Sequence, residues 1–252
     1  MHLLLLLLAF FLPPKAQAGE IIGGHESKPH SRPYMAYLEF VAQGESKMCG
    51  GFLIREDFVL TAAHCLGRPM CVTLGAHNIE NKEENHQVIP VKRTIPHPYY
   101  DNQSFHNDIM LLQLEKKAKL NATVQPIKLP RDKDKVKPGK VCLVAGWGRM
   151  ATNGNYPNTL QEVELTLQED QVCKKLFRNY NSNIEICAGD PKKKNAFFQG
   201  DSGGPLVCNH VAQGIVSYTN NNGTPPGVYT KVSRFLQWIK ETMESHLLQE
   251  TD

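Results

Sequence analysis

The chain has 252 residues, a formal net charge of +3 and 41% hydrophobic residues. Its basic residues gather at Arg131 to Lys140 and at Lys192-Lys193-Lys194 without interleaved aromatic residues, so we expect no nucleic-acid partner. We interpret both clusters as solvated loops. The alternative is electrostatic attraction to the sulfate groups of an acidic proteoglycan.

The first residues predict a secretory signal peptide over residues 1–18. An apolar run from Leu3 to Leu12 is followed by Ala16-Gln17-Ala18, whose small residues suit a cleavage site. The run is too short to span a bilayer, and no later run is long enough for a transmembrane helix. We therefore expect a soluble, exported protein.

Short apolar runs separated by turn residues fill most of the remaining chain, which predicts an all-β fold of antiparallel sandwiches or barrels. In the first half, about 21–124, the runs are Tyr34–Val41, Gly51–Ile54, Phe58–Leu60, Val72–Leu74, Val88–Val91 and Ile109–Leu114. In the second half, about 125–238, they are Val141–Gly146, Leu160–Leu167, Pro205–Val207, Gly214–Tyr218 and Gly227–Val232.

The chain ends in a helical pattern over about 233–248, followed by a tail at 249–252. Apolar residues recur there at steps of three and four, at Phe235, Leu236, Ile239, Met243 and Leu247. This spacing gives the helix one apolar face. We expect that face to dock on the second barrel.

Three local motifs supply the elements of nucleophilic catalysis. Ser202 lies in Gly200-Asp201-Ser202-Gly203-Gly204-Pro205, where glycines allow close approach of a bound carbonyl. The backbone N–H groups of Gly200 and Ser202 can then aim at a developing oxyanion. A serine nucleophile also needs a base and a group that orients the base. His64 in Thr61–Cys65 and Asp108 in Asn107–Leu112 are the candidates.

With these motifs in the order His64, Asp108, Ser202, the chain resembles the trypsin/chymotrypsin-type serine proteases. The resemblance implies two six-stranded antiparallel β-barrels with the active site in the cleft between them. It implies that Ser202 attacks a peptide carbonyl, that His64 transfers the proton and that Asp108 holds the imidazole tautomer. Ser217 matches the family position that supports the buried aspartate. No cofactor and no metal is implied.

The start of the mature chain, Ile21-Ile22-Gly23-Gly24, suggests an activation switch. In the family, cleavage before such an isoleucine frees an α-ammonium that pairs with the acid preceding the nucleophile, here Asp201. The preceding dipeptide, Gly19-Glu20, resembles those that a dipeptidyl peptidase removes from granzymes, mast-cell chymases and cathepsin G.

Further segments match this granzyme subgroup, closest to the granzyme B and granzyme H kind, and the likeness covers residues 21–245. They are Pro29–Ala36, Leu74–Ile79 and Asp108–Leu112. The resemblance implies protein substrates, storage in cytoplasmic granules, release outside the cell and inhibitors of the serpin type. A role in cytolysis and apoptosis would follow by family analogy alone.

The resemblance also locates the pocket for the P1 side chain, the residue before the scissile bond. Ala196 stands at its base where trypsin-like relatives carry aspartate, and Gly227 stands where granzyme B carries an arginine. We therefore expect neither basic nor acidic P1 residues but apolar ones. The resemblance places four further residues at the pocket: Gln199, Ser217, Tyr218 and Thr219.

Phe197 and Thr219 add bulk where most relatives carry small residues, which favours Leu, Met or Val at P1 over Trp or Tyr. If Phe197 turns outward, Phe and Tyr would fit, as in a chymase. Thr219 is also positioned to hinder substrate strands and make activity narrow or feeble. A different class of function is a catalytically weak homologue that binds glycans or microbes through its positive charge.

Seven cysteines in an exported chain indicate disulfides and one leftover thiol. The resemblance implies the pairs Cys49–Cys65, Cys142–Cys208 and Cys173–Cys187. Cys71 is then either a partly buried thiol in a monomer or the link in a disulfide dimer. A further bridge of many relatives is absent, since Phe198 and Asn220–Asn222 occupy its place. Sequons predict glycosylation at Asn102, Asn121 and Asn222.

Overall fold

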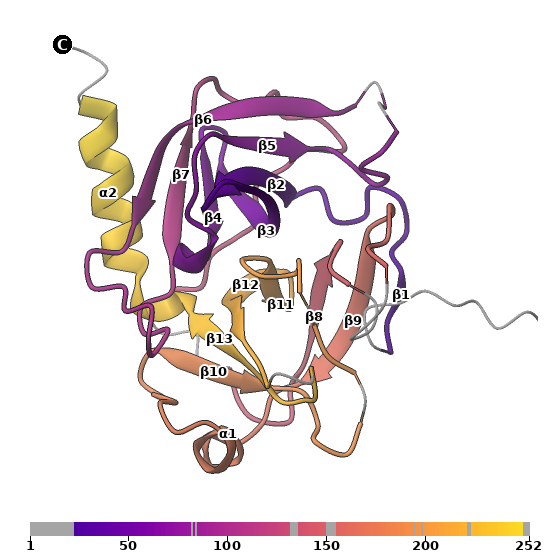
Figure 1. Cartoon of the computed structure of the whole chain (residues 1–252), viewed down its shortest axis with the longest axis vertical. Helices are drawn as coiled ribbons and strands as arrows, with labels where there is room; N and C mark the ends of the chain where they lie inside the picture. The colour runs from indigo at the N-terminus through magenta and orange to yellow at the C-terminus, as the bar shows by residue number, and fades with distance from the viewer. Residues whose placement is uncertain are drawn as a thin grey trace, which may run out of the picture.

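The computed structural model describes residues 23–81, 83, 85–131, 136–149, 155–193, 195–197, 199–220 and 223–248. The predicted signal peptide, the activation dipeptide and the 249–252 tail lie outside the described residues. So do Ile21, Phe198 and Asn222. The described chain forms two β-structures stacked on one another, with the N-terminal one above the C-terminal one in Figure 1.

The first half is a closed antiparallel barrel in the order β2-β3-β4-β7-β6-β5. Its strands are β2 (Met35–Ala42), β3 (Glu45–Arg55), β4 (Phe58–Thr61), β5 (Met70–Leu74), β6 (Gln87–Pro96) and β7 (Met110–Leu114). β4 and β7 are buried along their whole length, which explains why their sequences are apolar runs rather than alternating patterns. β4 leads into the segment that carries His64, and β7 directly follows the segment that carries Asp108.

The second half is a seven-stranded sheet in the order β1-β9-β8-β11-β12-β13-β10. Its strands are β1 (His25–Glu26), β8 (Val141–Gly146), β9 (Gln161–Thr166), β10 (Glu185–Ala188), β11 (Pro205–Cys208), β12 (Val211–Tyr218) and β13 (Gly227–Lys231). The expected six strands are β8 to β13. A single antiparallel bridge between Leu167, just after β9, and Ala188, at the end of β10, joins the segment after β9 to the opposite edge strand of this sheet.

Besides the six expected strands, the second sheet contains the two-residue strand β1. β1 comes from the N-terminal segment and pairs with β9, so the chain enters at the second sheet before it builds the first barrel. Two polar residues, His25 and Glu26, give no apolar signal, which is why the sequence pattern missed this strand. Among the six strands that the resemblance implies, β10 is the one for which no apolar run was named, although all four of its residues are buried.

The C-terminal helix packs against the first barrel, and the expectation that it docks on the second barrel was wrong. A 3₁₀ turn at Val232–Arg234 leads into α2 (Leu236–Leu248), which runs alongside the first barrel. Phe235 and Ile239 join that barrel's core, and the rings of Phe235 and Trp238 lie 5.2 and 5.0 Å from His97, just after β6. Helical spacing predicted the apolar face but carries no information about its partner.

One further helix, α1 (Asp170–Leu176), lies on the second half. Within the described residues, no helix is long and apolar enough to cross a membrane. The described chain thus forms two β-structures, and the segments between their strands bring the three predicted catalytic side chains together.

Candidate active site

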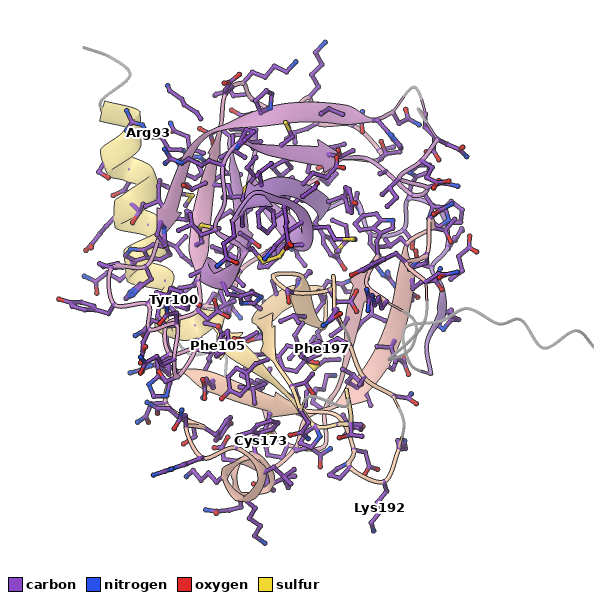
Figure 2. All side chains as sticks on the ribbon, in the orientation of Figure 1. Arg93, Tyr100, Phe105, Cys173, Lys192 and Phe197 are labelled. Carbon is purple, nitrogen blue, oxygen red and sulfur yellow. A yellow bond between two sulfur atoms is a disulfide. The ribbon has the colours of Figure 1, made fainter. Side chains whose placement is uncertain are left out.

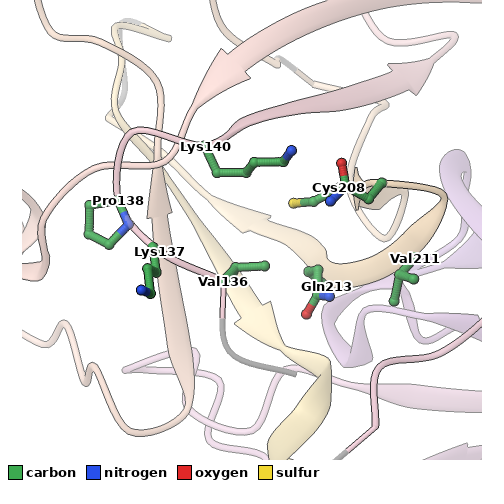
Figure 3. A pocket seen from close by; sticks show the side chains of 8 residues that line it. Val136, Lys137, Pro138, Lys140, Cys208, Val211 and Gln213 are labelled. Atoms are coloured by element: carbon green, nitrogen blue, oxygen red, sulfur yellow. The ribbon is translucent and has the colours of Figure 1, made fainter. Parts of the chain in front are cut away.

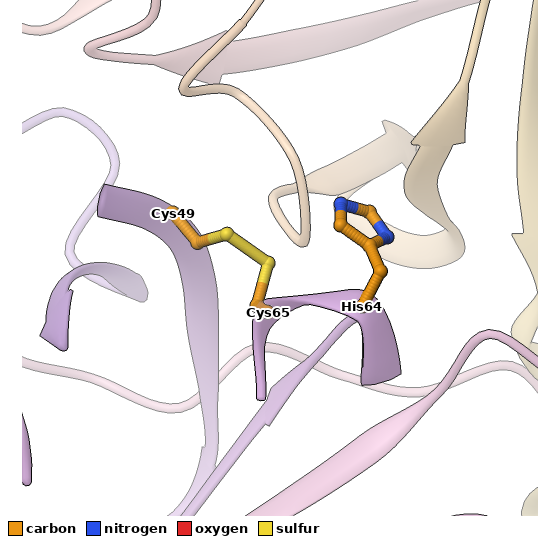
Figure 4. A group of neighbouring side chains, drawn as sticks. All are labelled: Cys49, His64 and Cys65. Atoms are coloured by element: carbon orange, nitrogen blue, oxygen red, sulfur yellow. A yellow bond between two sulfur atoms is a disulfide. The ribbon is translucent and has the colours of Figure 1, made fainter. Parts of the chain in front are cut away.

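His64 lies on a short 3₁₀ turn, Ala63–Cys65, directly after the buried strand β4. The next residue, Cys65, forms a disulfide with Cys49 of β3, so the turn is tied to a neighbouring strand (Figure 4). The backbone N–H of His64 also donates to Oδ1 of Asp108 at 3.0 Å. The disulfide and this hydrogen bond thus fix the backbone position of His64 independently of each other.

Asp108 is fully buried, and each of its acceptors has a donor. Nδ1–H of His64 donates to Oδ2 at 2.7 Å, and the Ser217 hydroxyl donates to the same oxygen at 2.5 Å. Thr230 Oγ1 donates to the backbone carbonyl of Asp108 at 2.8 Å. A buried carboxylate is costly unless it is hydrogen-bonded, and here the side chains of His64 and Ser217 and the backbone N–H of His64 meet that demand. The bond from Nδ1 leaves Nε2 of His64 free to act as a base toward the cleft.

Ser202 lies on the opposite side of this cleft, which has a volume of about 730 Å³ and is also lined by His64 and Gly200. Its backbone carbonyl accepts from Gly50 N–H at 2.8 Å, and Gly203 N–H donates to Val216 at 2.9 Å. Over the described residues, no hydrogen bond joins Ser202 Oγ to His64. Such bonds are often long in unliganded enzymes and tighten when substrate binds.

Gly200 has φ of +102°, a backbone conformation that side-chain-bearing residues rarely adopt. A Cβ added there would lie 2.8 Å from the Cα of Gly148. Glycine is therefore required at this position on both conformational and steric grounds, and the loop can present the N–H groups of Gly200 and Ser202 to one point.

Asp201 is completely buried and accepts a hydrogen bond from Gly148 N–H at 2.9 Å. Its carboxylate is so closely surrounded that a Cβ on Gly146 would lie 2.1 Å from Oδ1. Its predicted partner, Ile21, lies outside the described residues. The environment of Asp201 is suited to a buried charge, and the activation switch stays a prediction.

Comparisons with known proteins agree with this geometry. The family model described as "Trypsin" matches residues 21–239. The chain belongs to the trypsin family of serine proteases. It is 62% identical to human granzyme B over 247 residues, which cover 98% of this chain and all of that protein. Human granzyme H is 61% identical, covering 95% of this chain and 98% of the relative.

A more distant relative and a solved structure place the chain in the same part of the trypsin family. Human cathepsin G is 54% identical, covering 98% of this chain and 97% of the relative. The solved structure titled "Structure of GrC" superposes with a TM-score of 0.87 at 57% identity, covering 89% of this chain and all of that one. The chain is therefore a granzyme-like serine endopeptidase with a chymotrypsin-like fold.

Phe197, one of the predicted pocket residues, is buried in the second half of the molecule (Figure 2). Only 4% of its surface is exposed, and it belongs to the core of the second sheet. Its ring lies 5.2 Å from that of Tyr229, and a Cβ added to Gly227 would lie 2.2 Å from Cε1 of Phe197. Phe197 thus occupies the space in front of Gly227.

The other predicted pocket residues differ in exposure. Ala196 is buried, Gln199 is exposed, and Tyr218 and Thr219 are partly exposed. The Thr219 hydroxyl donates to the backbone carbonyl of Thr224 at 3.3 Å, so its side chain is held by its own loop.

The structure contains three disulfides, Cys49–Cys65, Cys142–Cys208 and Cys173–Cys187, which are the pairs that the resemblance implies. Cys71 on β5 is a partly exposed free thiol. The ligand atoms of Cys49, Cys65 and His64 lie within 4.8 Å of one another. Both sulfurs are in a disulfide and His64 is bonded to Asp108, so this group is not a metal site.

Two of the three predicted glycosylation sites, Asn102 and Asn121, lie within the described residues, and both are exposed. Asn121 Oδ1 accepts three hydrogen bonds within its own turn, from Thr123 and Val124. Sequence reasoning missed Thr230, which supports Asp108 from β13, because a single threonine within a strand gives no functional signal.

Proposed function

We propose that this chain is a granule-stored, secreted endopeptidase that cleaves proteins after apolar P1 residues through an acyl-enzyme. The observation that carries the proposal is the chain of hydrogen bonds from Ser217 through Asp108 to His64, which faces Ser202 across the cleft. It supports His64 as the base and Asp108 as the group that orients it.

In the proposed reaction, Ser202 Oγ bonds to the peptide carbonyl carbon while Nε2 of His64 takes the hydroxyl proton. The N–H groups of Gly200 and Ser202 stabilise the resulting oxyanion. His64 then gives its proton to the departing amine as the C–N bond breaks, which leaves the acyl-enzyme. Water, deprotonated by His64, releases the acid and restores Ser202.

Activation is proposed to require removal of Gly19-Glu20 by a dipeptidyl peptidase, after the signal peptide has been cleaved. The full burial of Asp201 supports this proposal, because a buried carboxylate without its cation costs about 3–5 kcal/mol. The new α-ammonium of Ile21 would supply that cation and stabilise the oxyanion loop.

Labelling by a serine-directed phosphonate tests both proposals. We expect the phosphonate to label the protein that begins at Ile21 and to label the protein that begins at Gly19 far more slowly. The processed Ser202→Ala protein should not be labelled. Correctly processed protein that neither labels nor hydrolyses peptides would contradict the enzyme function. Equal labelling with and without the dipeptide would contradict only the activation step.

The proposed P1 preference is for Leu, Met or Val. Its support is the inward Phe197 ring, which fills space beside Gly227, together with the uncharged base at Ala196. The outward orientation of Phe197, which would admit Phe and Tyr, is not the one observed. A peptide panel varied only at P1 tests this preference, and fastest turnover after Asp or Arg would contradict it.

A second candidate, binding of acidic proteoglycan, is supported by a cavity remote from His64. This cavity of about 590 Å³ is lined by Lys137 and Lys140 beside Cys208 (Figure 3). Both lysines are exposed, so their charges can attract sulfate groups at low cost.

Affinity for a sulfated glycan column tests this second candidate. The Lys137→Ala/Lys140→Ala variant should elute at lower salt than Lys116→Ala/Lys119→Ala, which removes the same charge from another exposed segment. Equal elution of the two variants would show that net charge alone governs binding.

A further inference from the structure

Glu185 is a buried carboxylate at the start of β10. It is 2% exposed, and Oε2 accepts from Asn181 N–H at 2.6 Å. The phenol oxygen of Tyr218 lies 3.3 Å from each carboxylate oxygen. Among the described residues, no lysine or arginine forms an ion pair with Glu185. Its hydrogen bonds to Asn181 and Tyr218 therefore hold it in place.

The charges around Glu185 come from several elements. Burial raises the pKa of the Glu185 carboxyl to about 7, and Asp108 adds to this rise. Three groups oppose it: the Asn181 N–H, His106 from the segment before β7, and the Tyr218 hydroxyl. The remaining neighbours with charge or a titratable group are Tyr180, which bonds to the Glu185 carbonyl, Lys231 on β13 and Asp170 on α1.

Tyr218 connects Glu185 to the catalytic histidine through a series of ring contacts. Its ring centroid lies 5.6 Å from that of Phe105 and 5.5 Å from that of Phe177. Phe105 in turn lies edge-on to His64, with centroids 5.8 Å apart. We call Phe105, Tyr218 and Phe177 the aromatic wall. It comes from three separate segments, and Figure 2 shows Phe105 at the junction of the two halves.

Tyr218 also follows Ser217, the residue that donates to Asp108. The trypsin-family resemblance implies that the segment around Thr219 pairs with the backbone of an extended substrate as an added strand. The aromatic wall meets the cleft at His64, through Phe105, and we expect the substrate residues that precede P1 to lie beside it.

We infer that Glu185 is a positioning residue for extended substrates, because its carboxyl fixes the Tyr218 phenol and thereby the aromatic wall. The inference rests on the proposed function, since it concerns the substrate side of the same cleft. The ionised carboxylate holds the phenol by a charge-assisted hydrogen bond, which is stronger than the bond to the neutral acid. The wall should thus be held more firmly above pH 7 than below it.

The test compares two substrates on processed enzyme between pH 6 and 8.5. One is a tetrapeptide amide that reaches the aromatic wall, and the other is an ester with only a P1 residue. For wild type, we expect KM for the tetrapeptide to fall about fivefold relative to KM for the ester as pH rises, which corresponds to about 1 kcal/mol. Taking the ratio cancels the titration of His64, which both substrates share.

The Glu185→Gln variant should remove this pH dependence, because the amide stays neutral. At pH 8 its tetrapeptide KM should be about fivefold above wild type, with kcat within twofold and the ester unaffected. Glu162→Gln is the matched control, since Glu162 is another buried carboxylate but pairs with Arg32 at 3.0 Å instead of an aromatic residue. It should keep the wild-type ratio at every pH.

The Tyr218→Phe variant provides a second measurement that does not depend on folding of the Glu185 variant. It keeps the ring, removes the phenol and should abolish the pH-dependent ratio. In that background Glu185→Gln should add no further change in KM. A ratio that stays pH-dependent in either variant, or equal changes for both substrates, would overturn the inference. Wild type that turns over neither substrate would instead contradict the proposed function.

Discussion

The two sides of the cleft are held by different kinds of interaction. Directed hydrogen bonds at 2.5–3.0 Å fix His64 and Asp108 on the side of the first barrel. On the other side, Phe197 is fixed by packing against Gly227 and the ring of Tyr229. Hydrogen bonds demand particular donors and acceptors, whereas packing accepts any side chain of suitable volume. The reaction should therefore tolerate almost no change, while the P1 preference should change with single substitutions.

The largest effect is expected from removal of the nucleophile. Ser202→Ala should lower kcat by about 10⁶, because the acyl-enzyme can no longer form. The thermal unfolding temperature should stay close to wild type, since the serine side chain makes no hydrogen bond within the described residues. Ser245→Ala on the exposed face of α2 is the control and should keep full activity. Residual acyl-enzyme in the Ser202 variant would contradict the assignment.

Asp108→Asn should have the next largest effect. The amide cannot accept from Nδ1–H of His64 and from Ser217 as the carboxylate does, so the imidazole should take the wrong tautomer. A decrease in kcat of about 10⁴ follows, with KM nearly unchanged. Steady-state kinetics on the peptide amide measures it. A higher KM with an unchanged kcat would show that Asp108 only maintains the shape of the cleft.

The motifs around His64, Asp108 and Ser202 were sufficient to predict the fold class and the residues that meet at the cleft. The reason is that each of these motifs consists of residues adjacent in the sequence, such as an acid before a buried strand or glycines around a serine, and can be recognised locally. The partner of α2 was not predictable in this way, because Phe235 and Ile239 specify an apolar face but not the surface it covers. The same holds for Thr230 and Glu185, which act across the sheet on residues far away in the sequence.

Glu185 predicts a pH dependence of stability. Its pKa is raised from 4.5 to about 7 in the folded chain, so the folded state binds more protons than the unfolded state between these values. Stability from this group is complete below about pH 4.5 and is lost as pH rises through 7. The shift corresponds to about 3–4 kcal/mol at 1.4 kcal/mol per unit, which solvent screening reduces to about 2 kcal/mol.

Urea unfolding of wild type and Glu185→Gln at pH 5 and pH 8 measures this term. The variant should gain about 2 kcal/mol relative to wild type between the two pH values, because glutamine has no proton to lose. Glu162→Gln should show no such relative gain. A constant difference between wild type and the Glu185 variant would mean that the carboxyl keeps one charge state across this range.

The smallest expected effect is a change in P1 preference on substitution of Phe197, which tests the packed side of the cleft without altering the hydrogen-bonded side. Phe197→Ala should open space in front of Gly227 and raise the ratio of kcat/KM for Phe to that for Leu at P1 by about tenfold. Gly227→Ala approaches the same contact from the other partner, since its new Cβ would lie 2.2 Å from the Phe197 ring and must displace it. Both variants should leave phosphonate labelling of Ser202 intact, because neither residue touches the hydrogen bonds around Asp108. If the P1 ratio stays constant in both while Leu turnover falls, the ring supports the second sheet without selecting the substrate.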